Sequence, residues 1–160
     1  MLMINICAKS NSLDVIRRAY VDGIKNVHIV FNDGHDIKIT KIRRMANVTL
    51  SPDKRTVAWL VLNTWIAEGD TVPQSGKLAI YKNGKTRYIE CGPFIRDYWF
   101  WMQGRQIATD CGGMHFAGTL TLYDIDTLRD IASFYQPDIP EDKQPAWSKS
   151  SSNSDSDTTH

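Results

Sequence analysis

The feature of the sequence that most limits its fold is an internal repeat with a spacing of 50 residues. Residues 48–59 align with residues 98–109, and each copy predicts a strand, a tight turn and a second strand. The apolar positions that coincide are Val48 with Tyr98, Leu50 with Phe100, and Val57 with Ile107. Residues 51–54, Ser-Pro-Asp-Lys, suit the first turn, because Pro presets φ and Ser and Asp bond the local backbone. Gly104 takes the same place in the second copy, and we expect Phe100 and Ile107 to face a common core.

A second hairpin follows each of these copies. Residues 78–89 alternate around Asn83-Gly84, a pair that accepts the positive φ angles of a type I′ turn. Residues 120–131 match this hairpin at an offset of 42 residues. An earlier partial copy, residues 30–34, aligns with residues 80–84 and has Asp-Gly at its turn. The order along the chain is therefore half a unit followed by two whole units.

The repeat resembles the units of TolB and WD40-like β-propellers. The resemblance lies in Leu-Ser-Pro-Asp-Lys-Arg-Thr-Val-Ala-Trp at residues 50–59 and in the later Tyr123-Asp124 step, and it covers residues 25–135. It implies a mainly β fold of antiparallel repeated hairpins, either about two and a half propeller-like blades or an open sandwich, since a closed propeller typically has at least four blades. Small uncharacterised exported bacterial proteins are similar in the same way.

Composition divides the chain of 160 residues into three parts. Residues 1–12 are expected to be a leader or a flexible N-terminus, and residues 13–137 a single β domain. Residues 138–160 are expected to be a disordered tail, because Pro, Ser and Asp dominate there and bury too little apolar surface to offset chain entropy. The segment from Ser12 to Tyr20 fits a short helix, with a strand as the alternative.

Charge and motifs exclude several classes of function. The net charge of +1 gives no electrostatic footprint for nucleic acid. No apolar run approaches the roughly 20 residues of a membrane span. The sequence has no catalytic, metal or cofactor motif, so we expect a protein that is not an enzyme. Residence is expected to be cytoplasmic, or periplasmic if a signal peptide lies upstream.

The cysteines bear on the compartment. Of the three, Cys7, Cys91 and Cys111, the last two flank a single predicted hairpin. We therefore expect Cys91 and Cys111 to lie close together, and to be bonded if the protein is exported.

The candidate binding residues are aromatic and acidic. Trp65, Glu68 and Asp70 occupy a long loop, and Trp99 and Trp101 share one face of a predicted strand. Trp is enriched where proteins bind proteins. These residues favour a non-enzymatic protein-binding domain, such as an inhibitor or immunity protein against a bacterial toxin or effector that acts on the cell envelope. An oligomer is compatible with the repeats.

Two alternatives remain open from the sequence. Trp99 and Trp101, if exposed, would suit a carbohydrate-binding module. Cys111 and His115, if in contact in a cleft, would suit an enzyme with a Cys nucleophile. Exposure of the tryptophans and the state of Cys111 separate these alternatives from protein binding.

Overall fold

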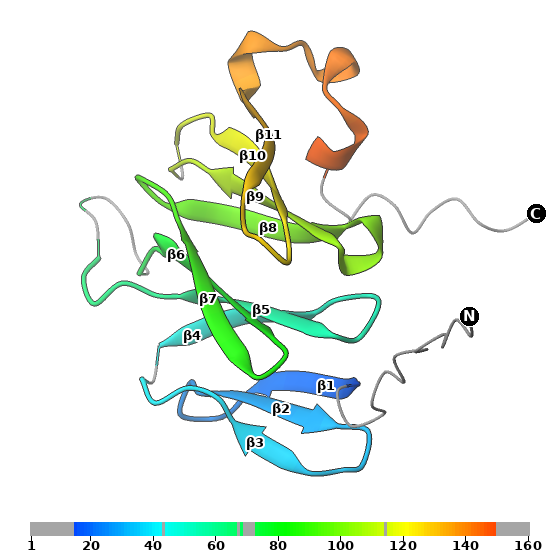
Figure 1. Ribbon diagram of the computed structural model, residues 1–160. Helices are drawn as coiled ribbons and strands as arrows, with labels where there is room; N and C mark the ends of the chain where they lie inside the picture. The colour runs from blue at the N-terminus through cyan, green and yellow to red at the C-terminus, as the bar shows by residue number, and fades with distance from the viewer. Residues whose placement is uncertain (1–14, 43, 67, 69–72, 114, 150–160) are drawn as a thin grey trace, which may run out of the picture.

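The molecule consists of three antiparallel β-sheets stacked face to face (Figure 1). This computed structural model describes residues 15–42, 44–66, 68, 73–113 and 115–149. Within those residues no helix is long and apolar enough to cross a membrane. The predicted mainly β class of antiparallel repeated hairpins is confirmed.

The strands follow one another across each sheet in chain order. The first sheet contains β1 (Ile16–Val21), β2 (Val27–Phe31) and β3 (Asp36–Lys38). The second contains β4 (Met45–Leu50), β5 (Thr56–Val61), β6 (Lys77–Lys82) and β7 (Lys85–Glu90). The third contains β8 (Ile95–Trp101), β9 (Gln106–Cys111), β10 (Thr119–Asp124) and β11 (Asp130–Tyr135).

The first sheet is a unit that lacks one strand. Its three strands match the last three of the second sheet, so the first copy of the repeat is larger than the half unit expected. The helix expected from Ser12 to Tyr20 is wrong where the structure describes it. Residues 16–21 form β1, which pairs with β2. In this strand the side chain of Ile16 is buried in the apolar layer between the first and second sheets, and this contact favours the strand.

Two layers of apolar side chains hold the three sheets together. Because successive residues of a strand point to opposite faces, Trp59 of β5 faces the first sheet while Ala58 and Leu60 face the third. Phe100 and Ile107 lie opposite each other on β8 and β9 and belong to the second layer, which confirms their predicted common core. The second sheet is thus buried on both faces.

The predicted turns are where the sequence places them. Asn83 and Gly84 have φ angles of 51° and 76°, as a type I′ turn requires. Ser51 Oγ accepts a hydrogen bond from Thr56 N at 3.0 Å, which closes the turn between β4 and β5. Gly104 has φ of 91°, and a Cβ on it would lie only 2.9 Å from the Cβ of Ser51. The equivalent turns of two units therefore pack against each other.

The outer face of the first sheet is polar. His28 stacks on Tyr20 with ring centroids 5.0 Å apart, and its two ring nitrogens lie 3.1 Å from Asp22 and 2.9 Å from Asp36. Hydrogen bonds from Tyr20 and then His28 hold the pKa of Asp36 below its usual range. Among the residues that the structure describes, no further sheet or segment is stacked on this face.

The outer face of the third sheet is apolar and is covered by residues 136–149. This segment forms three short 3-10 turns, Gln136–Asp138, Glu141–Lys143 and Ala146–Ser148. Trp147 packs edge-on against Phe134, with centroids 5.6 Å apart, and its carbonyl accepts a hydrogen bond from Trp99 Nε1 at 2.8 Å. The disordered tail expected from residue 138 is therefore wrong up to residue 149. A single Trp in a polar, Pro-rich stretch provides the apolar contact. Residues 150–160 lie outside the described residues.

We predict that Trp147→Ala destabilises the protein by about 2–3 kcal/mol, somewhat less than the cost of removing a fully buried Trp, because Trp147 is half-buried. Urea denaturation followed by circular dichroism measures this loss. A chain that stops after Lys149 keeps every contact described above and serves as the control. Equal stability of Trp147→Ala and the native chain would show that the C-terminal turns contribute nothing to the fold.

Candidate functional site

The connections between strands are two to five residues long at one end of the stack and four to fifteen residues long at the other. The strand registers place residues 22–26, 39–44, 62–76, 91–94 and 112–118 at the same end, which we call the loop end. It lies at the left of Figure 1. The opposite end carries only tight connections such as Asn83-Gly84 and is called the turn end.

Exposed apolar side chains gather at the loop end. Among the described residues, nine large hydrophobic side chains are exposed, and six of them lie on loops or strand termini of this end. The six are Ile24, Ile42, Trp65, Ile66, Phe116 and Tyr135. The most exposed is Phe116, at 67%. Large exposed apolar side chains that cluster on one surface mark sites of interaction.

The predicted loop residues lie in this region as far as the structure describes them. Trp65 is 54% exposed and rests against Phe94, with ring centroids 5.9 Å apart. Glu68 is exposed. Asp70 lies outside the described residues. Trp65 and Glu68 are therefore available to a partner, and Trp65 is supported by an aromatic neighbour from the next connection.

The predicted strand residues do not form an exposed platform. Trp99 is only 5% exposed, and its indole donates to the carbonyl of Trp147. Trp101 is half-buried and packs against the same apolar layer. Trp99 is therefore not exposed as a binding residue would be, and the binding role of the half-buried Trp101 stays a prediction. Residues 136–149 cover this face of the sheet. The alternation of residues along a strand predicts which side chains share a face, but it does not predict whether another segment covers that face.

Cys91 and Cys111 form a disulfide between the end of β7 and the end of β9, with their Cα atoms 6.0 Å apart. The bond ties the second sheet to the third at the loop end. Because Cys111 is bonded, it presents no thiol that His115 could activate. His115 is exposed on the loop that follows β9.

An arginine fixes the loop that carries Phe116. Arg96 grips Asp110 through both carboxylate oxygens at 2.8–3.1 Å. The same guanidinium donates to the carbonyl of Phe116 at 2.9 Å and to Gln136 Oε1 at 2.9 Å. A bidentate, charge-assisted contact of this kind is strong and directional. The exposed ring of Phe116 therefore projects from a loop whose backbone is held in place.

The glycines of this loop serve close packing. A Cβ on Gly118 would lie 2.0 Å from Asp110 Oδ1, and one on Gly113 would lie 2.5 Å from the ring of Phe116. Neither position admits a side chain without displacing its neighbour. The Gly-rich run beside Cys111 and His115 is thus explained by the packing around Asp110 and Phe116.

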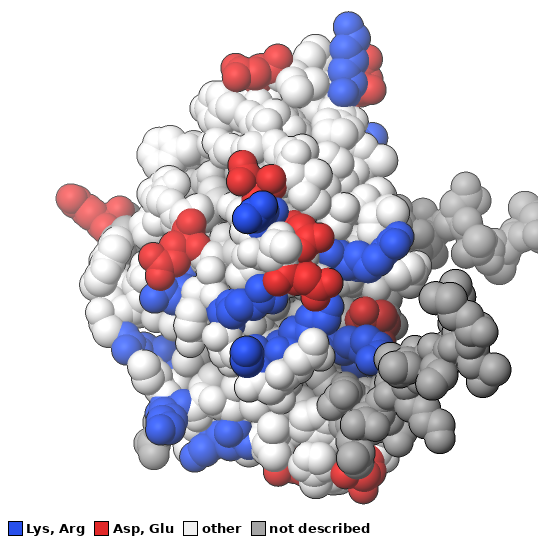
Figure 2. Space-filling view, in the orientation of Figure 1, with Lys and Arg blue, Asp and Glu red and all other residues white. Residues whose placement is uncertain are grey.

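Two neighbouring ionisable side chains of β8 have pKa values that burial shifts. Burial raises the pKa of Asp97 above its usual range, and burial likewise raises that of Tyr98, whose hydroxyl donates to the carbonyl of Ala58 at 2.9 Å. Among the described residues, no cluster of three or more His, Cys, Asp or Glu residues could hold a metal ion. Basic and acidic side chains mix over the middle of the molecule (Figure 2).

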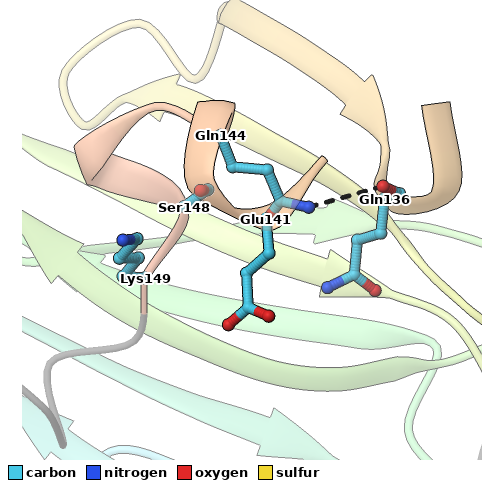
Figure 3. Close-up of a pocket in the computed structure, with 5 residues that line it drawn as sticks. All are labelled: Gln136, Glu141, Gln144, Ser148 and Lys149. Atoms are coloured by element: carbon cyan, nitrogen blue, oxygen red, sulfur yellow. Dashed lines mark hydrogen bonds between the residues drawn. The ribbon is translucent and has the colours of Figure 1, made fainter. Parts of the chain in front are cut away.

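A polar cavity of about 440 Å³ lies beneath the C-terminal turns (Figure 3). Its lining residues are Gln136, Glu141, Gln144, Ser148 and Lys149. Gln144 Nε2 donates to the carbonyls of Gln136 and Ile139 at 3.4 and 3.0 Å, which closes the first two turns. No nucleophile among these lining residues is paired with a base. All five lining residues belong to the segment 136–149 that covers the third sheet.

No protein-family model matches the chain, and a search of curated proteins finds no match. The candidate site therefore depends on its own geometry: the exposed apolar residues of the loop end, held by the disulfide and by Arg96.

We predict that Gly118→Ala destabilises the protein by about 2 kcal/mol or more, because the new methyl group must displace Asp110 and disturb its pairing with Arg96. Chemical denaturation measures the change. Gly23→Ala is the matched control, since a Cβ there meets nothing within 4 Å. The two variants losing the same stability would contradict the packing role of Gly118.

We predict that replacing Cys91 and Cys111 together by Ala costs about 3 kcal/mol, the loss expected when a cross-link closing a loop of this length is removed. Denaturation curves of the native chain with and without a reductant provide the parallel measurement. If neither the double variant nor reduction lowers the midpoint, the disulfide does not support the loop end.

Proposed function

We propose that the protein acts by stoichiometric binding of another protein through its loop end. The observation that carries the proposal is the concentration of exposed apolar side chains there, six of the nine found among the described residues. One of these side chains is Trp65, and Trp is enriched at the hot spots of protein interfaces. The turn end offers only Met102 and Ile131 among the exposed large hydrophobic residues.

Rigidity at the loop end supports this proposal. The disulfide, the Arg96 contacts and the ring of Phe94 against Trp65 fix parts of three connections before any partner arrives. A surface that is ordered in advance loses less conformational entropy on binding. Such a surface suits an inhibitor, which gains affinity from a preformed shape.

The class of partner that we propose is a bacterial toxin or effector that acts on the cell envelope, with this chain as its inhibitor or immunity protein. The disulfide supports this choice, because such bonds persist in oxidising compartments, among them the bacterial periplasm. The bond at Cys111 and the burial of Trp99 favour protein binding over the enzymatic and carbohydrate-binding alternatives.

We predict that Trp65→Ala or Phe116→Ala weakens binding of the partner at least about tenfold, the effect of losing roughly 1.4 kcal/mol at a hot spot. The partner is recovered from an extract of the host cell envelope, and its affinity and stoichiometry are measured by calorimetry. Met102→Ala, which removes a comparably exposed side chain at the turn end, should leave the affinity unchanged. Retained affinity in both loop-end variants, with a loss in Met102→Ala, would overturn the proposal.

A further inference from the structure

The outer edges of the three sheets differ in charge. Each sheet has two edge strands, and we call outer the edges formed by the last strand of each sheet along the chain, β3, β7 and β11; strands β1, β4 and β8 form the other edges. Strand β3 carries Asp36 and Lys38, and β7 carries Lys85, Arg87 and Glu90. Charged side chains of this kind protect an edge from pairing with another strand. Strand β11 reads Asp-Ile-Ala-Ser-Phe-Tyr and has a single charge, at its first residue.

The edge of β11 is open. Strand β11 pairs only with β10. Gln136 N donates to Gly118 O at 3.1 Å, so the alternation of an antiparallel ladder turns the backbone groups of Ser133 and Tyr135 away from β10. Among the described residues nothing pairs with that outer side. Figure 2 shows charged side chains near the lower end of β11 and few over the part of the third sheet above it.

The covering segment leaves this edge free. From Gln136 the chain crosses the outer face of the sheet until Trp147 meets Trp99, which belongs to β8 at the opposite edge. The C-terminal turns therefore lie over the face of the sheet and leave the side of β11 accessible.

We propose that β11 pairs with β11 of a second copy of this chain, antiparallel and around a two-fold axis at Ser133, to give one continuous sheet of eight strands. The strand is complementary to itself in this register. Ala132 lies opposite the second copy's Phe134, so that a small side chain meets a large one, and Ile131 lies opposite its Tyr135. The side chains of Ile131 and Tyr135, 50% and 45% exposed, then cover each other.

Charge also favours a second copy as the occupant. In an antiparallel pair the two Asp130 residues lie at opposite ends of the joint, so no like charges meet. The nearest irregularity is a bulge at Ile131, which has no opposite residue in β10, while residues 132–135 keep a regular register. The edge shares Tyr135 with the loop end, but the pairing uses the backbone of β11 and neither Trp65 nor Phe116, so this inference does not depend on the proposed function.

Sedimentation equilibrium of the full chain at high micromolar concentration tests the proposal. The native chain should have twice its monomer mass of 18.2 kDa. Ser133→Lys places two ammonium groups face to face at the axis and should give the monomer mass. Gln103→Lys adds the same charge at an exposed position of the turn end and should remain dimeric. Near-ultraviolet circular dichroism establishes that each variant is folded. A monomeric native chain, or a dimeric Ser133→Lys variant, overturns the proposal.

Cross-linking tests the register. In a Cys7→Ser background, Ser133→Cys should be joined to its copy by a short reagent with two thiol-reactive groups, because the two residues face each other at the axis. Tyr135→Cys should not be joined, because the two copies of residue 135 lie more than about 13 Å apart along the strands. A cross-linked Tyr135→Cys beside an unlinked Ser133→Cys would exclude the axis at Ser133.

Discussion

The burial of both faces of the second sheet is the interaction on which the rest of the structure depends. Trp59 and Ala79 contribute to one apolar layer, and Ile80 and Leu78 to the other. A lone sheet of this size exposes an apolar face on each side, so its stability comes from the neighbours that cover it. Removing either neighbour would return one whole layer to water.

The first and third sheets each have an outer face on which no further sheet packs, and these two faces differ in polarity. The first sheet turns the polar cluster of Tyr20, His28 and Asp36 outward, so this face has polar side chains that can meet water. The third sheet turns Trp99 and Leu122 outward, and the chain itself returns to cover them with Trp147. Among the described residues, the surfaces left for other molecules are then the ends of the strands and the sheet edges, of which β11 carries a single charge.

The same architecture separates folding from recognition. Tight turns such as Asn83-Gly84 set the register at one end of the strands, while the longer loops at the other end are free to carry Trp65 and Phe116. The disulfide and Arg96 then hold those loops without using the apolar core. A rigid β scaffold that displays loops from one end is a common basis for binding.

The sequence by itself determined the local part of this structure. The repeat spacing, the alternation of Phe100 and Ile107 and the Asn83-Gly84 turn predicted antiparallel hairpins, because turn chemistry and strand periodicity act over a few residues. It also predicted that Cys91 and Cys111 lie together and that Trp65 belongs to a long loop. The mistakes at Trp99 and at residues 138–149 have a different origin.

Only the tertiary structure decided which face of each strand is covered, and by what. Trp99 alternates as an exposed platform would, yet a segment about 40 residues later in the chain lies over it. Strand β1 fits a helix locally and becomes a strand because Ile16 has an apolar layer to enter. The grouping of Ile24, Ile42 and Phe116 at one end likewise depends on how the sheets stack. The periodicity of the sequence indicates which side chains share a face of a strand. Burial of that face depends on contacts with segments far away in the sequence, and a local sequence pattern does not contain information about those contacts.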